Sequence, residues 1–145
     1  MSAEHFTMYL ESAESQGSWN GFSPFLNSGK LENEQPVVVL TRATLRFSKI
    51  WDFWQKVKNV SLGLEKYEGR KFSIGVGEWP WIQQATISIW QTQAEMLDYA
   101  YKNQKHKEAI LLARKYGWFK EEMFARFLPV RCEGIWNGKN AENLI

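Results

Sequence analysis

The chain has 145 residues, enough for one domain with a modest core, and 44 % of them are hydrophobic, which excludes a disordered tail. The net charge of +2 comes without a basic arm or stripe and argues against nucleic-acid binding, while a single cysteine, Cys132, excludes an internal disulfide and any cysteine-based metal site. The acidic start lacks the apolar core of a signal peptide, and no apolar run reaches the roughly 18 residues of a membrane helix, so we expect a soluble, cytoplasmic protein.

The first part of the chain predicts two strands and two helices. Residues 4–11 are β-prone, whereas residues 12–35, rich in Ser, Gly and Asn, are expected to form a loop. Residues 36–47 predict the clearest strand, opened by a proline at its first position. Ser48 is expected to cap a helix whose apolar face consists of Ile50, Phe53, Trp54 and Val57. A second short helix is predicted over residues 62–67.

The remaining residues predict two adjacent strands, a helical stretch and a last strand. The two strands cover residues 70–79 and 83–90. Thr92 is expected to cap the helical stretch, which breaks near Asn103 and ends at Gly117. The last strand covers residues 122–136, with Pro129 at a break or an edge position. The order strand, helix, strand, strand, helix, strand predicts an α+β fold of the ferredoxin-like βαββαβ type.

Two of these strands share a face of small, mildly polar side chains. Alternation along the strands assigns to this face Ser73, Gly75, Gly77, Thr86 and Ser88. A sheet face covered by helices normally carries Val, Ile and Leu instead. The small residues therefore leave volume for a ligand or for a second sheet, and Trp79 and Trp90 are candidate pocket residues because they lie on the same face.

A short phrase occurs twice, as GSWNG at residues 17–21 and as GIWNG at residues 134–138. The segments before the two copies also align, EHFTMYL over EMFARFL with Glu4 over Glu122, after a slip of one residue. Only the closing strand of the first copy is present. The repeat therefore predicts that residues 1–35 are the remnant strand and loop of a first lobe, and that residues 36–145 form a ferredoxin-like α+β domain.

Five segments carry a resemblance to a known family: LTRATLR (40–46), IGVGEWPW (74–81), ATISIW (85–90), AYKNQKHKEAI (100–110) and GWFKEEMFARF (117–127). In these segments the chain resembles spheroidene monooxygenases, oxygenases of carotenoid biosynthesis, from about Glu4 to its C-terminus. The resemblance implies haem as cofactor, an acyclic carotenoid or similar long apolar substrate, and an external electron donor such as ferredoxin. It also implies a place close to the membrane in which carotenoids reside.

The resemblance also implies a relation to dimeric α/β-barrel proteins, in which two ferredoxin-like lobes close a barrel. Members of the family usually carry the whole first lobe, whereas this chain begins at the last strand of that lobe. Because an open four-stranded sheet leaves one face and its edges uncovered, we expect a homodimer whose two sheets pair. The strand at residues 4–11 is expected either to extend its own sheet or to cross to the partner.

Under this resemblance His106 is the candidate ligand of the haem iron. Helical spacing places it with Ala109, Ile110 and Ala113, and a neutral imidazole on an apolar face can ligate iron. The alternative is a buried structural histidine, because a lone histidine is not a metal signature. The other histidine, His5, aligns with Met123 in the repeat and is not favoured.

Arg42 and Arg126 are the candidate catalytic residues, since a cavity-facing guanidinium can stabilise an oxygen species or a propionate. The alternative for both is an exposed or ion-paired arginine, with Glu78 or Glu122 as candidate partners of Arg42. Two further alternatives stay open for the whole protein, a cofactor-free α/β-barrel monooxygenase and a non-catalytic binding or scaffold protein. No dinucleotide fingerprint or catalytic triad can be assembled from this sequence.

Overall fold

The computed structural model describes residues 4–61, 69–79 and 81–145. Its strands are Phe6–Gly17 (β1), Val37–Leu45 (β2), Arg70–Trp79 (β3), Gln83–Trp90 (β4), Phe119–Trp136 (β5) and Lys139–Asn140 (β6). Its α-helices are Ile50–Ser61 (α1), Gln93–Lys102 (α2) and Gln104–Tyr116 (α3), and two 3-10 turns cover Phe47–Lys49 (η1) and Ala141–Leu144 (η2). The predicted helix over residues 62–67 lies outside the described residues.

The strands form one antiparallel sheet in the order β1-β5-β2-β4-β3, and β6 pairs with the end of β5. The sequence β2, α1, β3, β4, α2 with α3, β5 is the predicted βαββαβ order, so the ferredoxin-like α+β fold is confirmed. β1 extends this same sheet by pairing with β5. Of the two placements expected for the first strand, the structure therefore has the first.

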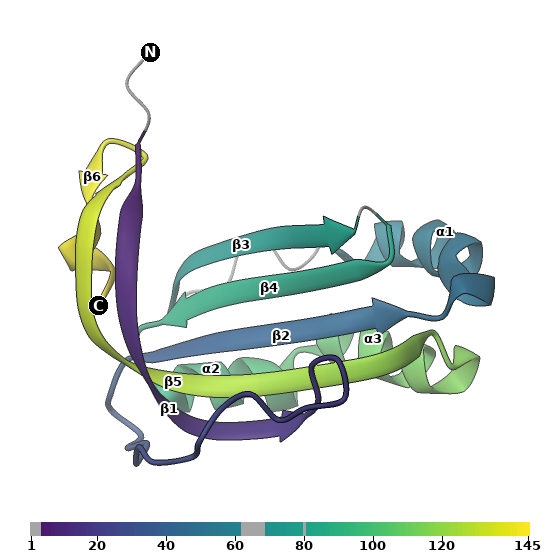
Figure 1. Cartoon of the computed structure of the whole chain (residues 1–145), viewed down its shortest axis with the longest axis horizontal. Coiled ribbons are helices and arrows are strands. Elements are labelled where there is room, and N and C mark those ends of the chain that lie inside the picture. Colours follow the sequence, from purple (N-terminus) through teal and green to yellow (C-terminus); the bar gives the residue numbers. More distant parts are fainter. Residues whose placement is uncertain (1–3, 62–68, 80) are drawn as a thin grey trace.

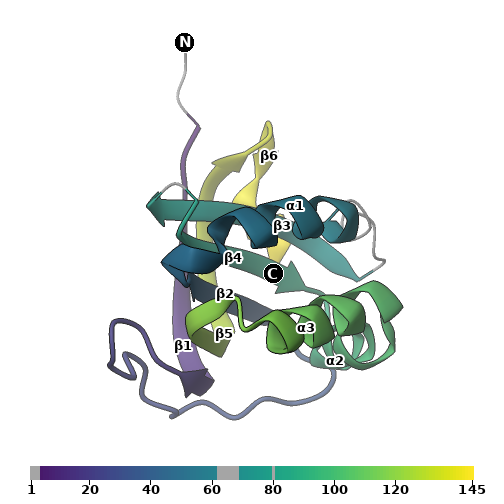
Figure 2. The same cartoon turned by 90° about the vertical axis from the view of Figure 1, so that its right-hand side faces the viewer.

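The three helices lie on one side of the sheet, with α1 at the far end and α2 and α3 behind β2 and β5 (Figure 1; Figure 2). On this side α2 packs Met96 and Tyr99 against Val37, Val39 and Trp90. At the end of the sheet near α1, a second cluster joins β2, α1 and the residue before β5 through Leu45, Phe53 and Trp118. The face of the sheet that carries these residues is called the helix face below.

The opposite face is covered by the sheet itself. The C-terminal half of β5 and the start of β1 bend away from the rest of the sheet (Figure 1), and they bring Phe6, Met8 and Trp136 onto Val38, Ile89 and their neighbours. Leu144 of η2 and Phe25 of the loop complete this apolar cluster. The long, curved β5 thus lets the sheet cover part of its own opposite face.

The capping signals of the second helical stretch are confirmed. The Thr92 side chain accepts a hydrogen bond from the backbone N–H of Glu95, and Asn103 separates α2 from α3. The Asn103 side chain also accepts from the backbone N–H of His106. Gly117 ends α3 in the left-handed conformation. These signals were readable from sequence because each one acts within a single turn of the chain.

Two local predictions are wrong. Residues 12–17 are strand rather than loop, because pairing with β5 continues through Gly17 opposite Met123 and overrides their polar composition. Ser48 does not cap a helix: it lies inside η1, which begins after Arg46 and leads directly into α1. The apolar face of α1 is as predicted at Phe53, which is buried, and the side chain of Val57 lies outside the described part.

The repeated phrase forms two equivalent turns at the two ends of the β1–β5 pair. In both copies the first Gly, the Asn and the last Gly have positive φ, and the values agree within about 20° from one copy to the other. The carboxylate of Glu121 accepts hydrogen bonds from the backbone N–H groups of Asn20 and Gly21. The carboxylate of Glu4 does the same for Asn137 and Gly138.

The structural equivalent of Glu4 is therefore Glu121, one residue before the Glu122 that sequence alignment placed there. The numbering offset between Glu4 and Glu121 also relates Gly17 to Gly134 and Trp19 to Trp136. The two copies therefore match without the one-residue slip that the sequence alignment needed. The antiparallel register, with Phe6 opposite Gly134 and Gly17 opposite Met123, relates β1 and β5 by an approximate twofold axis between them. The division into residues 1–35 and 36–145 stays a prediction.

Candidate functional site

A shallow depression of about 360 Å³ opens on the helix face at the free edge of the sheet. Its floor is formed by β3 and β4, and its walls by Trp54 of α1 and Trp81 of the β3–β4 turn. Three of the predicted small residues, Gly75, Gly77 and Thr86, line it. The volume lies at the lower end of the range for small-molecule pockets.

The two tryptophans at the rim hold each other in place. Their ring centroids lie 5.3 Å apart at 78°, and the Trp54 indole N–H donates to the backbone carbonyl of Trp81 at 3.2 Å. Trp81 has φ of +79°, a left-handed conformation that is unusual for a bulky residue. Backbone strain of this kind is kept where the surroundings enforce it, and such positions concentrate at binding sites.

Gln84 is the polar side chain of the depression that sequence reasoning missed. Its Nε2 atom is buried and has no hydrogen-bond partner in the described structure. An unpaired buried amide is costly and is explained when a ligand accepts the hydrogen bond. The alternation that selected Thr86 and Ser88 also includes Gln84, so this signal was present in the sequence.

The other predicted pocket residues lie elsewhere on the same face. Ser88 and Trp90 are buried beneath α2, where the Trp90 indole N–H donates to the Ser88 hydroxyl at 3.0 Å. Ser73 is exposed beside the depression, and the side chain of Trp79 lies outside the described part. β4 thus connects an open region, at Gln84 and Thr86, with a packed region at Ser88 and Trp90.

His106 is joined to this packed region through Tyr99. The Trp90 and Tyr99 ring centroids are 5.0 Å apart, and those of Tyr99 and His106 are 5.3 Å apart. Burial lowers the pKa of His106, which keeps the imidazole neutral near pH 7. Within the described residues, neither ring nitrogen of His106 has a hydrogen-bond partner.

These features test whether His106 can ligate haem iron. A neutral imidazole can donate a nitrogen lone pair to iron, but the described residues provide no acceptor for the second ring N–H, which a ligating histidine usually has. The space between β4 and α2 is filled by Trp90, Tyr99 and Met96, and the depression is lined by other residues. The imidazole is therefore a suitable donor, and His106 is the residue that would hold the group. No cluster of three or more metal-ligating side chains occurs in the described residues.

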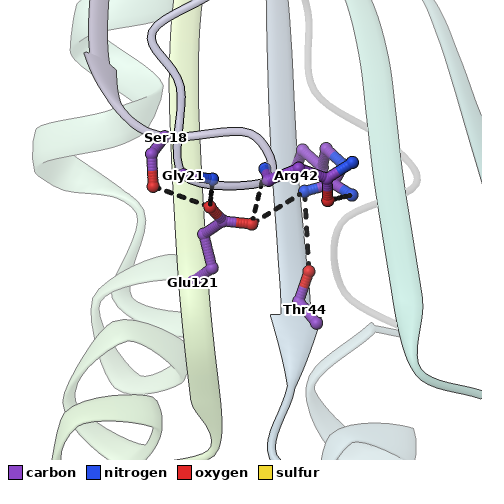
Figure 3. A network of polar contacts seen from close by, with 6 residues as sticks. Ser18, Gly21, Arg42, Thr44 and Glu121 are labelled. Carbon is purple, nitrogen blue, oxygen red and sulfur yellow. Dashed lines mark hydrogen bonds and ion pairs between the residues drawn. The ribbon is translucent and has the colours of Figure 1, made fainter.

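Arg42 lies on the opposite face of the sheet, where it is 2 % exposed. Its guanidinium stacks 4.5 Å from the Trp19 ring and forms an ion pair with Glu121 at 3.3 Å. Further contacts reach Thr44 and Asn20, both at 3.5 Å. Figure 3 shows Arg42, Thr44 and Glu121 beneath the loop that carries Ser18 and Gly21.

Glu121 is the centre of this network. Hydrogen bonds from the Gly21 backbone and the Ser18 hydroxyl, followed by those from Asn20 and Arg42, lower the pKa of Glu121 to about 2. The carboxylate is therefore charged at neutral pH and ties the loop to β5. The actual partner of Arg42 is Glu121, a residue that the sequence analysis did not consider. These contacts favour the ion-paired alternative for Arg42.

Arg126 lies on the helix face, opposite Val39 of β2, and is therefore not brought together with Arg42. Its guanidinium forms an ion pair with Glu14 of β1 at 3.3 Å and lies 5.5 Å from the Phe124 ring. The Nε atom is buried without a hydrogen-bond partner in the part of the chain that the structure describes. The catalytic roles of Arg42 and Arg126 stay predictions.

Three curated relatives, all named spheroidene monooxygenase, are similar to this chain. The protein from Rhodobacter capsulatus is 39 % identical over 95 % of this chain and 58 % of its own length. The protein from Cereibacter sphaeroides is 37 % identical over 97 % of this chain and 44 % of its own length. The protein from Rubrivivax gelatinosus is 37 % identical over 86 % of this chain and 47 % of its own length.

Two solved structures are similar to this chain, and the first of them supports the fold. A conserved protein from Methanosarcina mazei matches 66 % of this chain and 93 % of its own, with a TM-score of 0.54 and 13 % identity. A heme-degrading enzyme from Listeria monocytogenes matches 80 % of this chain and 69 % of its own, with a TM-score of 0.43 and 22 % identity. No family model matches the chain.

The resemblance found in the sequence segments is thus confirmed, because sequence identity to the three relatives extends over most of the chain. The chain spans about half the length of the curated relatives that it matches. None of the helices in the described ranges is long and apolar enough to cross a membrane. By sequence, the chain therefore groups with the spheroidene monooxygenases, over a segment that amounts to about half of their length.

Proposed function

We propose that this chain acts in a monooxygenase for a carotenoid or a similarly long apolar substrate. The observation that carries the proposal is the 39 % identity to a spheroidene monooxygenase over 95 % of the chain. The depression on the helix face supports it, because aromatic walls at Trp54 and Trp81 and a glycine-lined floor suit a flat apolar chain. The unpaired amide of Gln84 would donate to an oxygen atom of the bound molecule.

We also propose haem as the cofactor, which the neutral imidazole of His106 would hold. Bound haem would supply the activation of dioxygen, and an external donor such as ferredoxin would supply electrons. The tilted stack of Tyr99 on His106 would hold the plane of the imidazole. Burial raises the pKa of Tyr99, so its hydroxyl stays protonated beside the histidine at neutral pH.

A haem titration followed by absorption spectroscopy tests the cofactor and its ligand. We expect a saturable Soret band in the wild type that is lost in His106→Ala. The matched control is His5→Ala, because His5 is the other histidine of the chain and is exposed. A band that survives His106→Ala would remove His106 as the ligand, and a wild type without a band would remove haem.

The substrate site is tested separately by filling the depression. Thr86→Phe places a ring above the floor, and we expect it to abolish oxygenation of an acyclic carotenoid supplied in detergent. Ser73→Phe is the matched control, since Ser73 is exposed on the same strand pair but does not line the depression. Unchanged oxygenation in Thr86→Phe would contradict the site. In that case, or without haem, the cofactor-free and scaffold alternatives stay open.

The homodimer stays a prediction, and the pairing of β1 limits how it can form. The edge of β5 through which two lobes would meet is occupied by β1 of the same chain. The approximate twofold axis would place a further lobe against the other edge of β1, as β2 lies against β5. A second lobe would therefore pair with β1 or displace it. The mass of the chain in solution, measured by light scattering, distinguishes a monomer from a dimer.

A further inference from the structure

Three large aromatic side chains are exposed together at one end of the molecule. Phe47 is 84 % exposed, Trp51 is 82 % exposed and Trp81 is 61 % exposed. Phe47 belongs to η1, Trp51 to the first turn of α1, and Trp81 to the turn between β3 and β4. We call these three residues the aromatic end. Exposing rings of this size to water is costly, and a group of them marks an interaction surface.

The aromatic end is continuous with the rim of the depression. Residues 47, 51 and 54 are spaced so that they follow one side of η1 and α1. The last of them, Trp54, contacts Trp81 of the β3–β4 turn. Trp54 also lines the depression together with Trp81. A molecule that enters the depression past Trp81 therefore passes the exposed rings first. Figure 2 looks onto this end, with α1 and α3 toward the viewer.

Basic side chains surround the aromatic end. Arg46 is exposed and Lys49 is half-buried, directly before α1. The last turn of α3, which packs beside α1, adds Arg114 and Lys115, both exposed. The acidic residue in the first turn of α1, Asp52, is engaged by Lys56 and by the Trp118 indole N–H. These four basic side chains, at Arg46, Lys49, Arg114 and Lys115, suit an anionic surface.

A second lobe that paired with β1 would not cover the aromatic end. The approximate twofold axis lies between β1 and β5, and the edge of β1 is where a second lobe would pair. The aromatic end lies with α1, at the end of the molecule opposite the bent halves of β1 and β5 (Figure 1). Closing the barrel would therefore leave the rings exposed.

We propose that the aromatic end is a docking surface for an anionic lipid bilayer. Aromatic rings with nearby basic side chains are the side chains that favour the interface between headgroups and acyl chains. The inference rests on the proposed function, since a substrate dissolved in lipid would reach the depression directly from the docked surface. Docking orients the chain so that α1 and the β3–β4 turn face the membrane.

Vesicle flotation tests this docking, with vesicles of phosphatidylcholine alone and of phosphatidylcholine mixed with phosphatidylglycerol. We expect the wild type to float with the mixed vesicles, less so at high salt. The double variant F47S/W51S should lower the partition coefficient at least about tenfold, because both rings lose their buried area in the interface. R46E/K49E should lower it on mixed vesicles through reversed charge.

The matched control is Tyr101→Ser, which removes a ring that is 69 % exposed on α2, away from the aromatic end. We expect it to change partitioning less than about twofold. A wild type that floats with neither vesicle would overturn the proposal, as would equal partitioning of F47S/W51S and wild type. A change of molecular mass in F47S/W51S, seen by light scattering, would assign the rings to a protein contact and would also overturn it.

The oxygenation assay in detergent separates this inference from the proposed function. F47S/W51S should keep wild-type turnover in detergent, because neither residue lines the depression, and should lose turnover when the substrate is embedded in vesicles. Turnover in both media by a protein that does not float would overturn only the docking surface. Flotation without turnover in either medium would overturn only the oxygenase.

Discussion

The two Gly-x-Trp-Asn-Gly turns have the same backbone and different surroundings. In each turn a glutamate at or just before the start of the neighbouring strand accepts hydrogen bonds from two successive backbone N–H groups. Trp19 of the first turn lies over the buried guanidinium of Arg42, whereas Trp136 of the second packs between Phe6 and Phe72 at 5.2 Å from each. The comparison teaches that the turn is a structural device, which the fold reuses with either a polar or an apolar neighbour.

The largest effect is expected from adding a side chain to the first glycine of either turn. Gly17→Ala and Gly134→Ala both place a Cβ onto a backbone carbonyl oxygen, of Glu122 and His5 respectively, at positive φ. Because backbone must move, we expect each to cost about 3 kcal/mol or more of unfolding free energy. Urea unfolding measures both. A large cost at one position only would break the equivalence of the two turns.

The tryptophans should differ in cost. Trp136→Ala removes a ring from an aromatic cluster and is expected to cost about 2–4 kcal/mol, below the cost of a fully buried ring because Trp136 is half-buried. Trp19→Ala removes the ring on which the Arg42 guanidinium stacks and should cost about 1–2 kcal/mol. Chemical denaturation of both variants gives the ranking. The reverse ranking would mean that the Arg42 contact, rather than apolar packing, dominates.

Acid should loosen the first turn through Glu121. The bound N–H groups and the Ser18 hydroxyl lower the pKa of Glu121 from 4.5 to about 2, so its contribution is complete above pH 4.5 and is lost as the pH falls toward 2. Glu121→Gln should therefore flatten the fall in stability over this interval. Glu4→Gln is the matched control and should keep the fall in stability over this pH interval, because Glu121 is unchanged. Unfolding free energies of the wild type and both variants, measured from pH 7 to pH 2, test this prediction. An equal fall in the wild type and in Glu121→Gln would contradict it.

The smallest effect is expected at the asparagines, which have φ of +52° at residue 20 and +50° at residue 137. Asn137→Gly should be nearly neutral, because glycine adopts this conformation without strain. Asn20→Gly should cost a few tenths of a kcal/mol more, since Asn20 also accepts a hydrogen bond from Arg42 at 3.5 Å. Thermal unfolding of the two variants measures the difference. Equal values would show that this contact contributes nothing.

Part of the candidate site could be predicted from sequence and part could not. Alternation along β3 and β4 found Gly75, Gly77 and Thr86, and it would have found Gln84 if continued by one step. It could not separate Thr86 from Ser88, because the position of α2 decides which of them is covered. Trp54 belongs to the site because α1 packs beside the β3–β4 turn, and Trp54 and Trp81 are more than 20 residues apart in the chain.

By itself, the sequence determined the βαββαβ order, the caps at Thr92, Asn103 and Gly117, and the doubled turn. Each of these depends on contacts within a few residues or on a regular period, which a linear pattern records. Only the tertiary structure decided that Glu121 pairs with Arg42 and that residues 12–17 join the sheet. It also decided that Phe47, Trp51 and Trp81 are exposed at the same end of the molecule. Those contacts join segments far apart in the chain, so their energies exist only after the strands have paired.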